Sequence, residues 1–177
     1  MFKKYYPSQY INSVFDIDFQ KLYDMGYRGI LFDVDNTLVH HGEDSNERVD
    51  RLIDSVRKIG FKVILLSDNS RARLERFVQN TNCPFIEEAG KPDPTNYLRA
   101  VKELGISKPE AICIGDQIFT DICGANRSCI DSILVHFVQV KEKEWIGLRR
   151  YLEKLILTFY RFSKQYNRLG NIERKGE

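Results

Sequence analysis

Two aspartates, Asp33 and Asp35, stand one residue apart directly after the apolar run 29–32. Neighbouring carboxylates repel each other, and each one makes ionisation of the other less favourable. We expect such a pair where a cation lies between the two groups, or where a substrate needs both of them. The spacing therefore indicates a site for a metal ion, for acid–base or nucleophilic chemistry, or for both.

A phosphate monoester is a substrate that would need these residue types. One carboxylate can attack phosphorus to form an aspartyl-phosphate, while a second group protonates the leaving oxygen and later deprotonates water. Asp33 and Asp35 could take these two roles. Ser67 and the backbone N–H groups after it, at Asp68 and Asn69, could grip phosphoryl oxygens.

A divalent cation would hold the nucleophile beside the phosphoryl group, because a bare carboxylate and a phosphate repel each other. Mg²⁺ suits this task, since it prefers oxygen ligands. Asp116, with Asp121 behind it, could complete the oxygen shell, and Lys91 could bind the charge that develops during transfer. Two roles stay open for Asp121: a direct metal ligand, or an acid in the first turn of a helix that supports the ligands.

Short apolar runs alternate with segments of helical periodicity, and these elements must position the polar side chains. We expect strands at five runs, 29–32, 62–66, 84–86, 111–114 and 132–135. Helices between them would give an α/β fold, a single three-layer, doubly wound, Rossmann-like domain with a mainly parallel five-stranded sheet. The polar residues follow the first four strands, so they should meet at one edge of the sheet, where ligands bind in such folds.

Capping residues mark the ends of the expected helices. Ser70 and Asp93 are residue types that begin helices, and Gly60 and Gly105 stand where helices would end. Arg73 is expected to lie on a helix surface, although it could also reach a substrate headgroup.

Four motifs resemble, in the same order, those of haloacid dehalogenase-like (HAD) phosphatases. They are Asp33-Val-Asp35-Asn-Thr37, Ser67, Lys91-Pro92 and Gly115-Asp116-Gln-Ile-Phe-Thr-Asp121. The resemblance covers residues 1–140. The segment 115–126 and the opening 6–10 are similar to the YqeG-type phosphatases of subfamily IIIA.

This resemblance implies that Asp33 is the nucleophile and Asp35 the acid–base, with the backbone carbonyl of Asp35 on Mg²⁺. It implies phosphatidylglycerophosphate as the substrate, because relatives in mitochondria and plastids are phosphatidylglycerophosphate phosphatases. Position 68 departs from the family, which more often has Asn there, and an inward-pointing Asp68 carboxylate would weaken anion binding. The expected site residues are Thr37, Ser67, Asp68, Asn69 and Lys91 for phosphate, and Asp33, Asp35, Asp116 and Asp121 for the metal.

Other functions stay open beside a phosphatase that acts on a lipid. The substrate could be a soluble sugar or nucleotide phosphate, because the residues around a phosphate say little about what carries it. A receiver-like signalling module would also combine a parallel sheet with clustered aspartates, but it gains nothing from an acid–base at Asp35. A non-catalytic partner-binding protein would not need the whole polar set.

The connections that follow Asp35 and Ser70 are short. The first leads into a helix that begins near Asn46, and the second leads to Lys91. We therefore expect no large cap domain and an open site. Such a site suits a phosphate presented on something large, such as a lipid headgroup at a membrane surface.

The end of the chain, residues 141–177, is expected to differ from the HAD-like domain over residues 1–140. It holds ten Lys and Arg against five Asp and Glu, so it carries +5, and the rest of a chain of net charge +2 carries −3. An amphipathic helix of roughly twenty residues is indicated. Its apolar stripe is Trp145, Leu148, Leu152, Leu155, Phe159 and Phe162.

Two interpretations of this helix stay open. The stripe could pack against the domain or form a dimer interface. Alternatively, a basic interfacial helix could make peripheral contact with anionic lipid. Residues 165–177 are polar and are expected to be frayed.

Composition excludes several classes of protein. A net charge of +2 on 177 residues gives no reason to expect nucleic acid. The four cysteines show no metal-binding spacing, which favours reduced thiols and a cytoplasmic location. No signal or transit peptide is visible, and the longest apolar runs fall far short of the ~20 residues of a membrane span. We expect a soluble protein, or one that lies on the inner membrane face.

Overall fold

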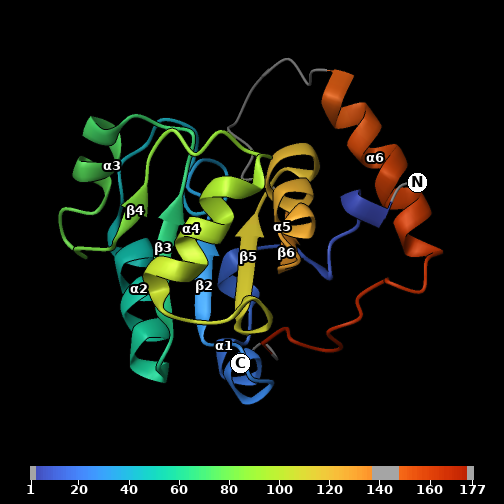
Figure 1. The fold of residues 1–177 in the computed structure, drawn as a ribbon, viewed down its shortest axis with the longest axis horizontal. Coiled ribbons are helices and arrows are strands. Elements are labelled where there is room, and N and C mark those ends of the chain that lie inside the picture. Colours follow the sequence, from blue (N-terminus) through green and yellow to red (C-terminus); the bar gives the residue numbers. More distant parts are fainter. Residues whose placement is uncertain (1–2, 137–147, 175–177) are drawn as a thin grey trace.

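The computed structural model describes residues 3–136 and 148–174 (Figure 1). The strands are β1 (Gln9–Ile11), β2 (Gly29–Phe32), β3 (Lys62–Leu66), β4 (Phe85–Ile86), β5 (Ala111–Gly115) and β6 (Asp131–Val135). The α-helices are α1 (Phe19–Asp24), α2 (Glu47–Ile59), α3 (Arg71–Phe77), α4 (Pro94–Leu104), α5 (Cys123–Arg127) and α6 (Leu148–Arg161). Shorter helical turns are η1 (Lys3–Tyr5), η2 (Val14–Asp16), η3 (Lys108–Glu110) and the π-helical η4 (Ile118–Ile122).

The strands form one parallel sheet in the order β1-β6-β5-β2-β3-β4. The five predicted strands are all present at the expected runs, and the sheet is parallel throughout. The expected number of strands was one too few, because β1 pairs with β6 at the edge (Gln9 opposite Ile133). A strand of three residues is too short to show an apolar pattern in the sequence.

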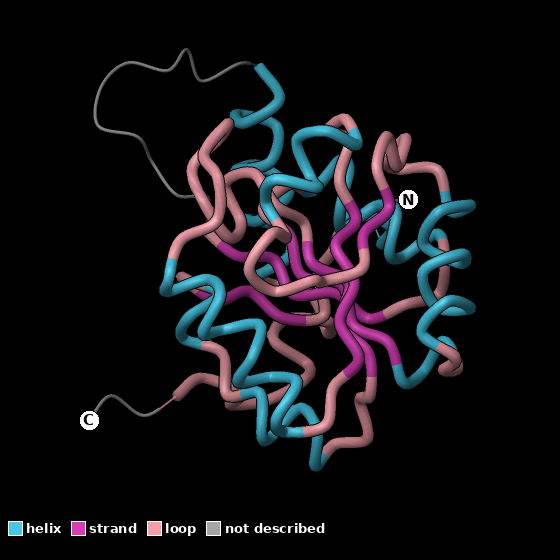
Figure 2. The backbone as a smooth tube through the Cα atoms, turned by 90° about the vertical axis from the view of Figure 1, so that its left-hand side faces the viewer, coloured by secondary structure: helices cyan, strands magenta, loops and turns pink. Residues whose placement is uncertain are grey.

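Helices cover both faces of this sheet (Figures 1 and 2), which confirms the three-layer α/β fold. Successive strand residues point to opposite faces. Ile30 and Phe32 of β2 pack with the apolar side chains of α1, α2 and α3. Leu31, between them, packs on the other face with α4 and α5. Because both faces are covered, every residue of β2 is buried.

The helix boundaries follow the predicted capping residues. Asp93 accepts a hydrogen bond from the Thr95 N–H at the start of α4, and Gly105 ends this helix in the left-handed region with φ 60°. Gly60 ends α2 with a φ of 120°. Ser70 precedes α3, but its side chain makes no capping hydrogen bond.

No cap domain is inserted between the strands at the carboxyl edge, as predicted. Over residues 33–46, all of which the structure describes, the chain forms turns and a single bridge between Asp35 and Val39. Over residues 67–84, also fully described, the only helix is α3. The carboxyl ends of β2 and β3 therefore carry only short connections.

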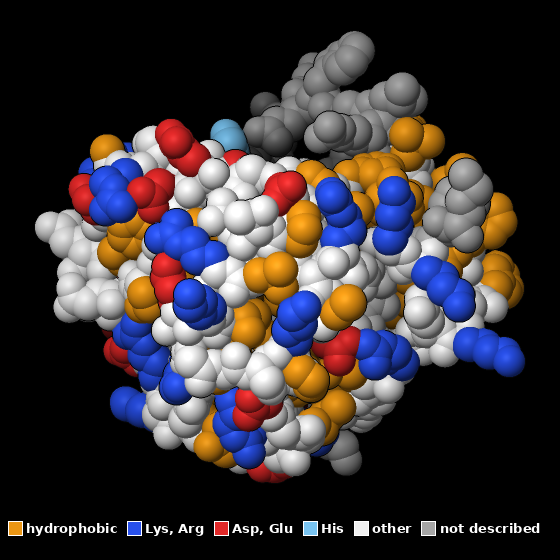
Figure 3. Space-filling model, viewed as in Figure 1, with side chains coloured by type: hydrophobic (Ala, Val, Ile, Leu, Met, Phe, Trp, Pro, Cys, Tyr) orange, Lys and Arg blue, Asp and Glu red, His pale blue; other side chains and the backbone are white. Residues whose placement is uncertain are grey.

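The helix α6 packs on the domain with side chains other than those of the predicted apolar stripe. Glu153, Ile156 and Tyr160 are its buried residues in the described range. Leu152 and Leu155, members of the predicted stripe, are exposed, and apolar side chains are visible over α6 in Figure 3. Trp145 and the beginning of the predicted helix lie outside the described residues. Among the described helices, none combines the length and apolarity needed to cross a bilayer.

Residues 167–174 also differ from the frayed end that we expected. The side-chain amide of Gln9 donates to the Gly170 carbonyl at 3.1 Å. The Asp18 N–H donates to the Ile172 carbonyl at 2.7 Å, and the Ile172 side chain is buried in the core. The returning tail therefore supplies hydrogen-bond partners for groups in the first part of the chain.

Candidate active site

The candidate site lies where the winding of the sheet reverses, between the neighbouring strands β2 and β5. The chain proceeds from β2 to β3 and β4 on one side, then crosses back to β5 on the other. Phe32 pairs with Ile114, so Asp33 and Asp116 leave adjacent strands at nearly the same level. This is the position at which open α/β sheets bind ligands.

Asp33 lies at the floor of the site, held by two donors. The Thr37 hydroxyl donates to Asp33 Oδ2 at 2.7 Å, and Lys91 Nζ donates to Asp33 Oδ1 at 2.6 Å. The pKa of Asp33 is raised to about 6, because burial and the adjacent Asp121 together outweigh the opposite effects of Lys91 and Thr37. Thr37 therefore contacts the proposed nucleophile directly in this structure.

Lys91 lies between two buried carboxylates. Its Nζ is 2.6 Å from Asp33 Oδ1 and 2.7 Å from Asp121 Oδ1. Burial alone would lower the pKa of the Lys91 ammonium, but Asp121 and Asp33 outweigh that effect and hold the pKa well above its usual value. Lys91 is thus charged, and it offsets part of the repulsion between the two aspartates.

Three buried aspartates form a group that could hold a metal ion. Asp33, Asp116 and Asp121 each offer a carboxylate oxygen, and these oxygens lie within 4.8 Å of one another. With all three ionised and Lys91 protonated, the formal charge of the cluster is −2, which matches a divalent cation. A donor set made only of oxygens suits Mg²⁺. The side chain of Asp35 is outside this group, and the ligand expected from this residue is its backbone carbonyl.

Gly115 makes room for Asp121. A Cβ placed on Gly115 would lie 2.4 Å from the Asp121 Cγ, which is too close for any side chain. The Gln117 N–H donates to Asp121 Oδ2 at 3.0 Å, while Lys91 binds the other oxygen. The missing side chain of Gly115 therefore lets the Asp121 carboxylate of η4 reach back to the sheet edge.

Asp35 is held apart from the cluster by three donors. Asn69 Nδ2 donates to Asp35 Oδ2 at 2.8 Å, and the Gly42 N–H and Arg73 Nη2 both contact Oδ1 at 3.1 Å. Burial would raise the pKa of Asp35, but these hydrogen bonds and the Arg73 charge lower it overall. Asp33 and Asp35 thus have pKa values shifted in opposite directions, a common sign of divided roles in catalysis.

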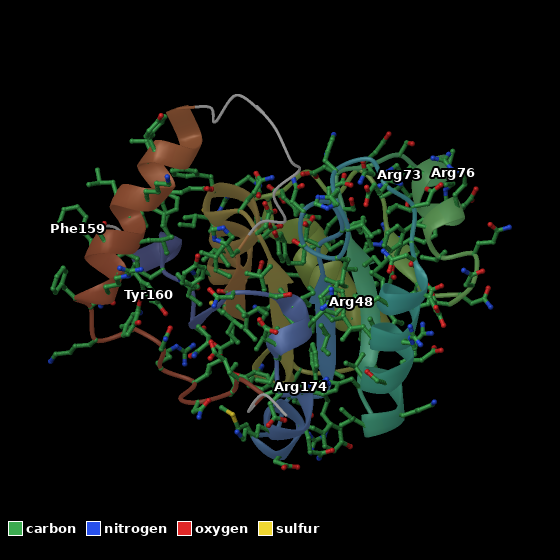
Figure 4. The ribbon with its side chains drawn as sticks, turned by 180° about the vertical axis from the view of Figure 1, so that it is seen from behind. Arg48, Arg73, Arg76, Phe159, Tyr160 and Arg174 are labelled. Carbon is green, nitrogen blue, oxygen red and sulfur yellow. The ribbon has the colours of Figure 1, made fainter. Side chains whose placement is uncertain are left out.

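Arg73 is the site residue that the sequence interpretation underestimated. It was expected on the surface of a helix, yet its side chain is only 12% exposed. Besides Asp35, it donates to the Glu43 carbonyl at 2.6 Å and to Asp44 Oδ1 at 3.1 Å, whereas Arg76 on the same helix lies further out (Figure 4). The sequence did contain one signal for this role: Arg73 lies in the first turn of the helix after β3, close to the edge of the sheet where the site residues gather.

The segment after β3 connects these groups. Ser67 is buried, and its hydroxyl accepts a hydrogen bond from Asn69 Nδ2 at 2.9 Å. Asn69 therefore bridges Ser67 and Asp35. Asp68 is exposed, and its carboxylate accepts a hydrogen bond from the Lys91 N–H at 3.1 Å. The unusual Asp68 thus supports the Lys91 loop and does not add a carboxylate to the buried cluster.

The chain is similar to known hydrolases and phosphatases. The family model of haloacid dehalogenase-like hydrolases matches residues 44–128. The chain is 32% identical over 160 residues to Probable phosphatase YqeG of Bacillus subtilis, which covers 89% of this chain and 93% of that protein. It is 23% identical over 84 residues to glyceraldehyde 3-phosphate phosphatase of Pyrococcus abyssi, which covers 42% of this chain and 35% of that protein.

Solved structures share the fold at low sequence identity. A HAD family hydrolase from Deinococcus radiodurans superposes with a TM-score of 0.54 at 13% identity, over 74% of this chain and 88% of that one. Deoxy-D-mannose-octulosonate 8-phosphate phosphatase from Haemophilus influenzae gives a TM-score of 0.51 at 17% identity, over 78% and 90% of the two chains. These likenesses concern the fold alone.

Binding of Mg²⁺ to the cluster predicts a stabilised native state. At about 100 times its Kd, a ligand of the folded state adds about 2.7 kcal/mol to the free energy of unfolding. For a chain of this size that corresponds to a rise in Tm of about 5–10 °C. Asp116→Asn should abolish most of the rise, because it removes one ligand of the buried group.

Thermal unfolding with and without MgCl2 measures this rise within each variant. Asp54→Asn, which neutralises an exposed aspartate on α2, is the matched control and should keep the full rise. An Asp116→Asn protein stabilised as much as the wild type would contradict the assigned ligands.

Proposed function

The chain belongs to the haloacid dehalogenase-like hydrolases and is a phosphatase, and from this premise we propose that it cleaves phosphate monoesters through an aspartyl-phosphate on Asp33. The observation that carries the proposal is the buried cluster in which Lys91 joins Asp33 to Asp121, with Asp116 beside them. The residues suit Mg²⁺, which we propose as the cofactor. When bound, Mg²⁺ would neutralise charge on the nucleophile and on the phosphoryl group.

In the first step, a carboxylate oxygen of Asp33 attacks phosphorus as the bond from phosphorus to the leaving oxygen breaks. The leaving oxygen takes a proton from Asp35. In the second step, Asp35 takes a proton from water, and that water attacks the phosphorus of the aspartyl-phosphate, which releases phosphate and restores Asp33. Lys91 keeps Asp33 oriented throughout.

Asp35 must move between its partners and the reacting oxygens. In the structure its contacts with Asn69, Gly42 and Arg73 favour the carboxylate, the form needed to activate water. To protonate the leaving oxygen, the side chain must leave these partners. Asn69 links Asp35 to Ser67, a proposed phosphate ligand, so phosphate binding and the position of Asp35 share one hydrogen-bond network.

For the substrate, we propose phosphatidylglycerophosphate. Two features support a phosphate carried by a lipid: the resemblance to YqeG-type phosphatases, and a carboxyl edge with no cap domain over residues 33–46. A phosphate on a small soluble molecule is the second candidate, because a curated relative is named for glyceraldehyde 3-phosphate, although it matches only 42% of this chain. We further propose a cytoplasmic location, with which the free cysteines among the described residues are compatible.

A panel of phosphate esters tests this function. Release of inorganic phosphate would be measured from an aryl phosphate, a sugar phosphate, a nucleoside monophosphate and phosphatidylglycerophosphate in mixed micelles. We expect Mg²⁺-dependent turnover, with kcat/KM greatest for the lipid. Asp33→Asn should lose turnover, and Asp35→Asn should slow it by about 10²–10⁴-fold, the usual contribution of an acid–base.

Asp54→Asn is again the matched control and should behave as the wild type. Equal or greater kcat/KM on the soluble esters would remove the lipid part of the proposal. Full activity of Asp33→Asn would contradict the proposed aspartyl-phosphate on Asp33.

Arg73 is predicted to position Asp35. Arg73→Gln should lower kcat by about 10–100-fold with little change in KM, because small misplacements of a reacting group have effects of this size. Steady-state kinetics on the aryl phosphate measure the changes in kcat and in KM separately. Arg76→Gln is the matched control, since Arg76 lies on the same helix, is 59% exposed and approaches Asp44 only to 3.7 Å.

Arg73→Lys should restore part of the rate, because it returns the charge without the planar fork of the guanidinium. A raised KM with an unchanged kcat would instead mean that Arg73 binds the substrate.

A further inference from the structure

Exposed apolar side chains gather on α6 and on the turn after it. Of the eight large apolar residues that are exposed in the described part of the chain, six lie between residues 151 and 166, on α6 and the turn after it. We call this surface the α6 apolar face. Its members are Tyr151, Leu152, Leu155, Phe159, Phe162 and Tyr166. Contiguous apolar surface of this kind marks an interaction site.

The α6 apolar face is distinct from the face that packs on the domain. Ile156 and Tyr160 are buried, while Leu155 is 54% exposed and Phe162 is 87% exposed. In Figure 4, Phe159 points away from the domain and Tyr160 points toward it. The helix is therefore held by one side and presents the other outward. Its inner contacts would persist while the outer side binds a partner.

The exposed charged side chains between residues 151 and 172 are all basic. Between residues 151 and 172 the basic residues are Lys154, Arg161, Lys164 and Arg168, and Arg168 pairs with Asp131. The only acidic residue in that range, Glu153, is buried and accepts a hydrogen bond from the Ile118 N–H at 3.0 Å. An apolar face beside exposed basic side chains fits a membrane surface, where negative headgroups border apolar acyl chains. A second copy would bring like charges together.

We propose that the α6 apolar face docks on an anionic lipid surface, with its aromatic and leucine side chains entering the boundary between headgroups and acyl chains. Lys154, Arg161 and Lys164 would then lie at the level of the negative headgroups. Aromatic side chains such as Tyr151 and Tyr166 suit this boundary, because they combine an apolar ring with a polar group.

This docking would bring the catalytic edge to the lipid. Glu153 and Ile156 contact η4, the element that carries Asp121. In Figure 1, α6 begins beyond the carboxyl ends of the strands, at the same end of the molecule as the site. The consequence for catalysis rests on the proposed function, whereas lipid binding itself does not.

Co-sedimentation with vesicles tests the docking without any hydrolysis. The full chain, in the absence of Mg²⁺, is mixed with vesicles of phosphatidylcholine containing phosphatidylglycerol, or with vesicles of phosphatidylcholine alone. We expect binding to the anionic vesicles that weakens with added salt, and weaker binding to the neutral ones. The double variant Leu155→Asp/Phe162→Asp should bind at least about tenfold more weakly, because two apolar anchors are lost.

Leu98→Asp is the matched control, because Leu98 is an exposed apolar residue on α4, away from α6. It should bind vesicles as the wild type does. Lys154→Glu/Lys164→Glu should weaken binding to the anionic vesicles while leaving the weaker binding to neutral vesicles unchanged. Hydrolysis of the aryl phosphate by each variant verifies that the fold and the site are intact.

Three results would overturn the inference. One is a wild type that does not bind anionic vesicles, and another is a Leu155→Asp/Phe162→Asp variant that binds them as well as the wild type. The third is a wild-type dimer that Leu155→Asp/Phe162→Asp converts to a monomer, with no vesicle binding by either form. In each case, continued hydrolysis of the aryl phosphate would leave the proposed phosphatase chemistry standing.

Discussion

One ammonium group among three buried carboxylates is the interaction on which the site depends. Asp33, Asp116 and Asp121 are brought within 4.8 Å of one another, and Lys91 is the cation that contacts two of them. Without it, burial and mutual repulsion would oppose ionisation of all three. With Lys91 protonated, the cluster keeps a formal charge of −2, which a divalent cation can neutralise. Asp33 is then available as a nucleophile for a phosphoryl group that would otherwise be repelled.

The fold separates the two aspartates of one turn into different environments. Asp33 faces the cluster, where burial and the adjacent Asp121 raise its pKa to about 6. Asp35 faces α3 and the 40–44 turn, where hydrogen bonds from Asn69, Gly42 and Arg73 lower its pKa. A nucleophile and an acid–base need such different surroundings. The parallel sheet makes this separation feasible, since β2, β3 and β5 each deliver a loop to the same edge.

The features predictable from the sequence are those with a local signal. Apolar runs located five of six strands, and the motifs from Asp33 to Asp121 located the cluster. The missed features depend on distant contacts. Strand β1 is stabilised by pairing with β6, and Arg73 is recruited by Asp35 across 38 residues of sequence. The side of α6 that is buried depends on its contact with η4, so hydrophobic periodicity could show an apolar stripe but not whether that stripe is buried or exposed.

The central claim is that Asp33 itself captures the phosphoryl group. The most direct measurement is a single turnover quenched in acid and reduced with borohydride, which converts an aspartyl-phosphate to homoserine, followed by mass spectrometry of the peptide containing residues 33–37. The account predicts homoserine at position 33 in the wild type and none in Asp33→Asn. An active enzyme with unmodified Asp33, or with homoserine at position 35, would contradict it.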